Sequence, residues 1–126
     1  MVKTRKLVSA VIAMIVASAV FAQTQNPHEG TWKATWQGAS RPLEASVVIK
    51  GMAGFWKTYS SSRSNPCVGR EAPLVVTSAT PDALSFTAKF SDVIATCENF
   101  DVELKRDGAL LKGTRGRLAV EMVRRD

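Results

Sequence analysis

The chain has little of the chemistry that enzymes and metal sites use. Its 126 residues include one histidine and two cysteines. A serine or cysteine nucleophile needs an adjacent base, but the histidine, His28, lies in a short polar segment ahead of the first strand pattern. The sequence also lacks a Cys-x-x-Cys pair, the ligand spacing of zinc sites and a glycine loop for phosphate. We therefore expect a protein that is not an enzyme, needs no cofactor or metal, and leaves His28 solvated.

The N-terminus has the pattern of a secretory signal peptide. Three basic residues open the chain, an uncharged run from Leu7 to Phe21 follows, and small residues end at Ala22. The run is shorter than the roughly 20 apolar residues that span a bilayer, which argues against a stable membrane anchor. We expect residues 1–22 to be a signal peptide cleaved after Ala22, and the mature protein to be periplasmic or secreted.

The remaining residues, 23–126, suffice for one compact domain. Removal of the leader takes away Lys3, Arg5 and Lys6 and so halves the formal net charge of +6. The basic character is therefore weak support for nucleic-acid binding, and we expect no nucleic-acid partner. Residues 23–29 are polar and contain Pro27, so we expect a flexible tail ahead of a domain at residues 30–126.

The two cysteines, Cys67 and Cys97, predict a disulfide, because an exported domain meets an oxidising compartment. A crosslink over a loop of about 30 residues stabilises a small fold by roughly 3 to 4 kcal/mol in the chain-entropy model.

Alternation of apolar and polar residues predicts eight short strands. Gly30-Thr31-Trp32-Lys33-Ala34-Thr35-Trp36-Gln37 shows this period clearly, with the tryptophans on one face. For the third strand two faces remain open, since either Trp56 and Thr58 or Phe55 and Tyr59 can point inward. The predicted strands cover residues 32–37, 43–50, 55–60, 73–78, 84–90, 100–105, 109–112 and 118–124, with residues 113–116 joining the last two.

Eight strands with short links predict an all-β, up-and-down antiparallel barrel, because closure removes the exposed sheet edges. In such a meander Cys67 and Cys97 lie in neighbouring links on one rim, where a disulfide can reach. Closure also brings the end of the last strand beside the start of the first. Arg124 is then expected to turn inward and stack on Trp32.

Gly30-Thr31-Trp32 at the first strand, with Arg124 at the end of the last, resembles the Gly-x-Trp and closing arginine of the calycin group, which includes lipocalins and avidins. The resemblance implies a barrel closed at one end by the Trp32–Arg124 contact, with a ligand mouth at the other rim. No avidin-like set of ring-stacking tryptophans follows in the later strands, so biotin binding is not implied.

The loop-rich rim gathers donors that suit a carboxylate, phosphate or sulfate. The candidate ligand-binding residues are Arg41, Arg63, Asn65, Arg70 and Arg115. They predict an exported binding protein for a small anionic or apolar ligand or an acidic surface. The alternative is that they are ordinary solvated loop residues. Small inward residues such as Ala34 and Ala45 can leave space for a ligand, but an eight-stranded barrel can also be filled by its own side chains.

A different function class fits the same features. Small periplasmic metalloprotease inhibitors of Gram-negative bacteria are similar in size, have one disulfide, and form an eight-stranded barrel behind an N-terminal tail that enters the enzyme. Residues 23–29 are a candidate for such a tail, so the alternative is an exported protein inhibitor of an enzyme that acts through its N-terminal tail or through the rim loops, with an envelope protein as the partner. The cysteines depart from that pattern, because they lie in mid-chain loops whereas that family joins early strands.

Overall fold

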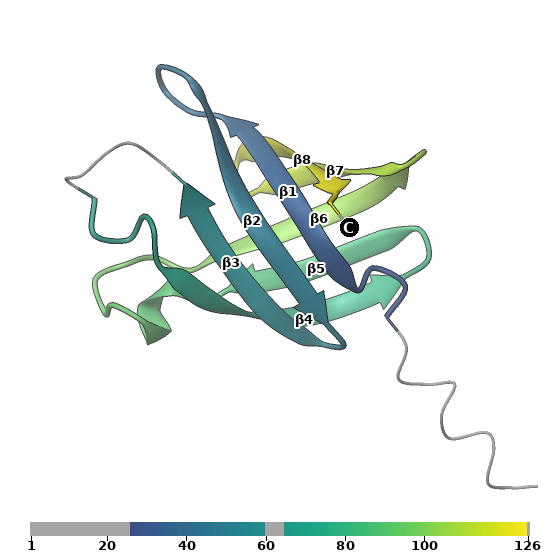
Figure 1. Cartoon of the computed structure of the whole chain (residues 1–126), viewed down its shortest axis with the longest axis horizontal. Coiled ribbons are helices and arrows are strands. Elements are labelled where there is room, and N and C mark those ends of the chain that lie inside the picture. Colours follow the sequence, from purple (N-terminus) through teal and green to yellow (C-terminus); the bar gives the residue numbers. More distant parts are fainter. Residues whose placement is uncertain (1–25, 60–64, 126) are drawn as a thin grey trace, which may run out of the picture.

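The computed structural model describes residues 26–59 and 65–125. Within this part of the chain eight strands follow one another around a closed antiparallel barrel, and β8 pairs with β1 (Figure 1). The strands are β1 (Gly30–Gln37), β2 (Pro42–Lys50), β3 (Ala53–Tyr59), β4 (Glu71–Thr80), β5 (Ala83–Ala88), β6 (Phe100–Asp107), β7 (Leu110–Arg115) and β8 (Leu118–Arg124). The predicted fold class is confirmed.

The alternation in β1 decides which side chains fill the interior. Trp32, Ala34 and Trp36 are at most 5% exposed, while the intervening residues face outward. In the β1–β8 register, Trp32 lies opposite Arg124 and Trp36 opposite Val120. The pairing that closes the barrel therefore places both tryptophans of β1 against the last strand.

The third strand resolves the ambiguity left by its sequence. Trp56 and Thr58 point inward, whereas Phe55 and Tyr59 are each 47% exposed. The indole Nε1–H of Trp56 donates to Thr58 Oγ1 at 2.8 Å, so these two buried polar groups satisfy each other. Trp56 is fully buried and contacts the Phe86 ring, which helps to fill the middle of the barrel.

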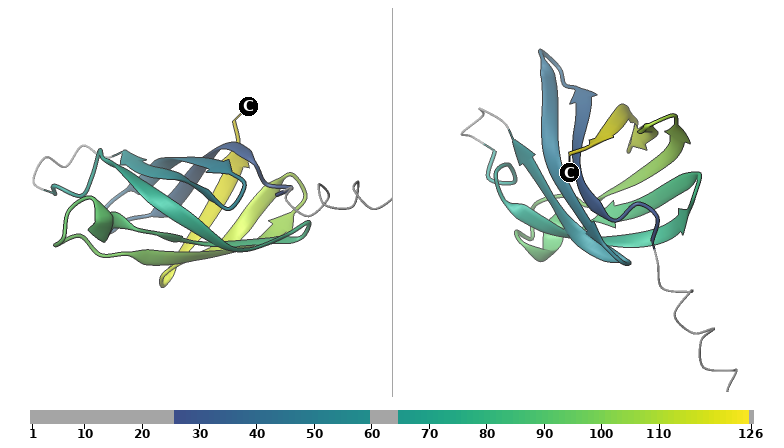
Figure 2. Two further views of the ribbon diagram at one scale, coloured as in Figure 1. Left: turned by 90° about the horizontal axis from the view of Figure 1, so that it is seen from below. Right: turned by 45° about the vertical axis from the view of Figure 1, so that its right-hand side comes forward.

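The links fall into two sets at opposite ends of the barrel (Figure 2). We call the end with the links after β1, β3, β5 and β7, which include the three longest links, the mouth. The other end, with the links after β2, β4 and β6, is the closed end. Cys67 and Cys97 form the predicted disulfide across two mouth links, with Cα atoms 5.9 Å apart. A short 3₁₀ turn, η2 (Phe90–Asp92), lies in the β5–β6 link.

Strand β7 is longer than predicted, and the expected link at residues 113–116 was wrong. The strand continues through Gly113 to Arg115, and the turn lies at Gly116 and Arg117. A Cβ at Gly113 would lie 1.8 Å from the backbone oxygen of Glu103 on β6. This glycine therefore permits close approach of two strands, a role of strand glycines that is easily mistaken for a turn.

The described part of the predicted tail packs on the closed end. Asn26 and His28 are 5% and 4% exposed, so the expectation of a solvated His28 was wrong. The Nδ2 of Asn26 donates to the Gly51 carbonyl, and the backbone N–H of His28 donates to Asn26 Oδ1, both at 2.8 Å. These bonds satisfy the polar groups that the packing buries. Residues 23–25 lie outside the described residues.

Candidate functional site

A cavity of about 520 Å³ opens at the mouth. Its walls come from strand ends and from three of the mouth links, so it forms only once the barrel has closed. One cationic side chain, Arg115, stands among mainly apolar neighbours. The described residues that line it are Trp36, Gly38, Ala39, Leu43, Thr58, Asn65, Cys67, Val68, Phe90, Glu98, Asn99, Phe100, Arg115 and Leu118.

Strand parity directs Arg115 into the barrel. Leu111 is buried, and side chains two and four residues later on the same strand face the same side. Arg115 pairs with Val102 of β6, whose side chain is fully buried. The arginine is thus the last inward residue of β7, at the mouth end of the strand, where it lines the mouth cavity.

Aromatic rings surround the Arg115 guanidinium. Its central carbon lies 3.9 Å from the ring centroid of Phe100, 4.8 Å from that of Trp36 and 5.9 Å from that of Trp56. The Phe100 ring in turn stacks on Phe90, with centroids 5.6 Å apart. Cation–π attraction of this kind strengthens as water is excluded.

The charge on Arg115 is nevertheless incompletely compensated. Its Nε atom is buried and has no hydrogen-bond partner among the described residues. Burial lowers the pKa of the Arg115 guanidinium from its ordinary value. Arginine keeps its proton at neutral pH. The Nε–H group of Arg115 is therefore a buried hydrogen-bond donor without an acceptor among the described residues. An oxygen atom of a ligand would accept a hydrogen bond from this Nε–H group.

Glu98 is the carboxylate residue that lines the same cavity. It is exposed, and the ion pairs between described residues join Lys33 to Glu44 and Lys112 to Asp107. Glu98 and Arg115 are therefore not paired. The cavity combines one interior cation with one anion at its solvent side.

The structure separates the predicted rim residues. Asn65 and Arg115 line the mouth cavity, and Asn65 Oδ1 also accepts the backbone N–H of Cys67 at 2.9 Å. Arg41 lines a smaller adjoining hollow of about 260 Å³. Arg70 is exposed and lines neither space, and Arg63 lies outside the described residues. The four described residues of this set do not form one cluster.

The aromatic partners of Arg115 were not predicted as site residues. Trp36 and Phe100 alternate with polar residues, which is typical of the buried face of a strand, and for Trp56 the sequence left the inward face open. One signal was present: Arg115 follows Leu111 by four residues, which is the inward parity of a strand. The glycine at position 113 obscured it, because glycine also marks turns.

At the closed end, Arg124 stacks on Trp32 as predicted from the sequence, but Arg124 remains exposed at the end of β8 and is not buried inside the barrel. The guanidinium carbon of Arg124 lies 4.4 Å from the Trp32 ring centroid, and its Nη atoms donate to the carbonyls of Glu29 and Pro27. The indole N–H of Trp32 donates to the His28 carbonyl at 2.9 Å. These bonds hold the segment before β1 across the barrel.

Within residues 26–59 and 65–125, no helix is long and apolar enough to cross a membrane. Comparison of the whole chain with protein-family models, with curated proteins and with solved structures finds no match.

Proposed function

We propose that this protein is an exported, non-catalytic binding protein of the calycin type, which holds a small amphipathic acid in the mouth cavity. The acid group would accept hydrogen bonds from Arg115, and the apolar body would lie against the neighbouring rings and aliphatic side chains. The observation that carries the proposal is the buried Arg115 Nε without a partner among the described residues.

The polarity of the cavity favours a ligand that has both an acid group and an apolar body. A buried charge without a partner is costly, and a ligand oxyanion would satisfy it with a charge-assisted hydrogen bond. Leu43, Val68 and Leu118 offer apolar surface around it. The volume of about 520 Å³ lies in the usual range for small-molecule sites, roughly 300 to 1,000 Å³.

The charge balance favours a monoanion. Arg115 supplies one positive charge, and Glu98 adds a negative one at the solvent side of the same cavity. A second negative charge on the ligand would meet Glu98, and the described residues that line the cavity include no second cation to compensate it. We therefore expect monocarboxylates or monosulfonates to bind better than dicarboxylates with the same apolar body.

Other features support export and a binding role. The leader pattern of residues 1–22 and the Cys67–Cys97 disulfide both suit an oxidising compartment. The Trp32–Arg124 contact supports the calycin resemblance. His28 lies at the closed end and both cysteines are oxidised, so no nucleophile–base pair of these residue types serves the mouth.

The inhibitor hypothesis receives less support. It assigns the N-terminal tail to a partner enzyme, but Asn26 and His28 are buried on the protein's own barrel. Removing that segment would also remove acceptors of Arg124 and of Trp32. An inhibitor acting through the tail would therefore have to use residues ahead of Asn26.

The proposal can be tested with two probes that differ by one acid group. 8-Anilinonaphthalene-1-sulfonate carries an aromatic body and a sulfonate, while N-phenyl-1-naphthylamine has the same body without the charge. We expect the sulfonate to bind at least about tenfold more tightly than the neutral probe, and Arg115→Met to abolish that preference. Arg117→Met, an exposed arginine in the adjacent turn, is the matched control.

Equal affinity of the two probes, or the same loss in Arg117→Met as in Arg115→Met, would reject the site. Native mass spectrometry of the purified protein provides a second readout. A co-purifying acid that is lost in Arg115→Met and retained in Arg117→Met would support the proposal and identify its natural ligand class.

A further inference from the structure

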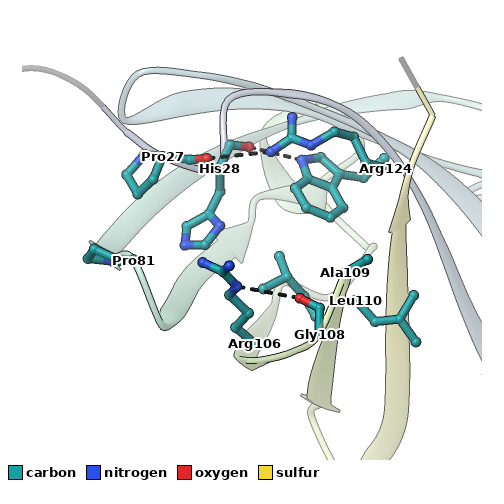
Figure 3. A pocket seen from close by; sticks show the side chains of 10 residues that line it. Pro27, His28, Pro81, Arg106, Gly108, Ala109, Leu110 and Arg124 are labelled. Atoms are coloured by element: carbon teal, nitrogen blue, oxygen red, sulfur yellow. Dashed lines mark hydrogen bonds between the residues drawn. The ribbon is translucent and has the colours of Figure 1, made fainter.

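The closed end holds a second cavity, of about 350 Å³, whose charged lining is entirely basic (Figure 3). Arg106 comes from the end of β6, Arg124 from the end of β8, and His28 from the segment before β1. No carboxylate side chain is among the described residues that line it. Two permanent positive charges therefore meet at one cavity without an opposing charge from its walls.

The His28 ring is fixed at this cavity. Its Nε2 lies 2.6 Å from the Thr80 carbonyl oxygen, and a carbonyl can only accept, so Nε2 carries a hydrogen. The ring belongs to a residue that is 4% exposed, and its backbone N–H and carbonyl bond to Asn26 and Trp32. His28 is thus a rigid wall of the cavity and not a mobile side chain.

Both arginines keep donors to spare. A guanidinium has five N–H donors. Arg106 uses its Nε for the Gly108 carbonyl at 3.4 Å, and Arg124 uses its two Nη atoms for backbone carbonyls. Figure 3 shows the Arg106 guanidinium directed toward the His28 ring, and the guanidinium carbon of Arg124 lies 4.4 Å from the Trp32 ring centroid. The hydrogen bonds of the described residues therefore leave most donors of the pair unoccupied.

Two nearby acidic side chains are engaged elsewhere, and a third, Asp82, follows Pro81 and accepts the backbone N–H of Arg106 through its carbonyl without lining the cavity. Asp107, next to Arg106, pairs with Lys112 at 3.4 Å. The Glu29 carboxylate accepts the backbone N–H of Gly51. None of these three carboxylates lines the cavity, so the two arginines there can still pair with an external anion.

We propose that this cavity binds a doubly charged tetrahedral oxyanion, a phosphate or a sulfate, free or as a monoester. Arginine forks suit such oxygens, and two arginines match a dianion in charge, whereas the described residues that line the mouth cavity include one arginine. Pro27, Pro81 and Leu110 add apolar wall on which the organic part of an ester can rest. The site lies at the opposite end from the mouth and does not rest on the proposed function.

His28 is the single histidine of the chain, so its ring gives one well-isolated signal in a ¹H–¹³C NMR spectrum. Inorganic phosphate, sulfate, glycerol 3-phosphate and acetate are titrated at fixed pH, with chloride keeping the ionic strength constant. We expect a saturable shift of the His28 signal with the dianions and at least about tenfold weaker binding of acetate.

Arg106→Gln tests the assignment, because Arg106 is exposed and lies outside the barrel core. We expect it to weaken phosphate and sulfate binding about tenfold or more. Lys105→Gln is the matched control, since it removes the same charge from the neighbouring exposed position but does not line the cavity.

A non-saturable shift, a dianion affinity no better than that of acetate, or equal weakening in Lys105→Gln and Arg106→Gln would overturn the proposal. Tighter binding of glycerol 3-phosphate than of inorganic phosphate would identify an esterified ligand, and the reverse order would identify the free anion. Either order, with the expected effect of Arg106→Gln, supports the site.

Discussion

The guanidinium of Arg115 lies 3.9 Å from the Phe100 ring centroid, although the two residues come from different strands. Phe100 is two residues before Val102, the direct partner of Arg115 across β6 and β7. The contact is therefore a diagonal cross-strand pair on the inner face, within reach of long side chains. It places a cation where a barrel of this size usually has core.

Arg115→Met is expected to leave the ligand-free protein as stable as the original or about 1 to 2 kcal/mol more stable. Methionine fills similar space without a charge that lacks a full set of partners, and such replacements are often neutral or stabilising. Urea unfolding would measure the difference. A loss of more than about 2 kcal/mol would mean that the cation–π contacts outweigh the cost of burial.

The pH dependence of this effect follows from the lowered pKa of Arg115. The folded state binds the proton of Arg115 less tightly than the unfolded state does. The resulting loss of folding stability is constant below the folded-state pKa and decreases only as the pH rises through it. The stability difference between Arg115→Met and the original protein should therefore not change between about pH 5 and 8. A difference that varies across this range would implicate another titrating group.

Removing the disulfide should lower the free energy of unfolding by about 3 to 4 kcal/mol, because the crosslink closes a loop with a sequence separation of 30. The double variant Cys67→Ser with Cys97→Ser tests this by urea unfolding. The reduced original protein is the control and should match it. A much smaller loss would show that the mouth links are already ordered by packing around Phe90 and Phe100.

Arg124→Met should cost roughly 1 to 2 kcal/mol, since Arg124 is exposed and loses a cation–π contact with Trp32 and two solvent-exposed hydrogen bonds. Arg125→Met is the matched control, because its side chain is exposed and its backbone bond to Thr31 remains. We expect that control to stay within about 0.5 kcal/mol. Equal losses of unfolding free energy in the two variants would show that the Arg124 contacts do not stabilise barrel closure.

Gly113→Ala should destabilise the barrel by at least about 3 kcal/mol or prevent folding, because the added Cβ would lie 1.8 Å from a backbone oxygen of β6. Gly108→Ala provides the comparison. Gly108 has a positive φ of 63°, and a Cβ added there would have no atom within 4 Å. The left-handed conformation alone should cost that variant about 1 to 2 kcal/mol. Thermal unfolding and soluble yield together distinguish the two, and similar losses would contradict the close-approach explanation.

Local pattern was enough for most of the fold. Two-residue alternation identified all eight strands, and the antiparallel order then placed Cys67 beside Cys97 and Arg124 beside Trp32. The local pattern gave wrong predictions where the same residue type occurs in two kinds of structure. Gly113 reads as a turn, and Asn26 to His28 reads as a polar tail, because neither their neighbours in sequence nor their polarity shows what packs against them.

The sequence by itself determined the barrel, its strand order and its crosslink, because these depend on the alternation of apolar residues and on short links. Only the tertiary structure decided which basic residues face a cavity. Arg115 enters the mouth and Arg106 joins Arg124 at the closed end because strand closure and register, which are long-range properties, set their neighbours.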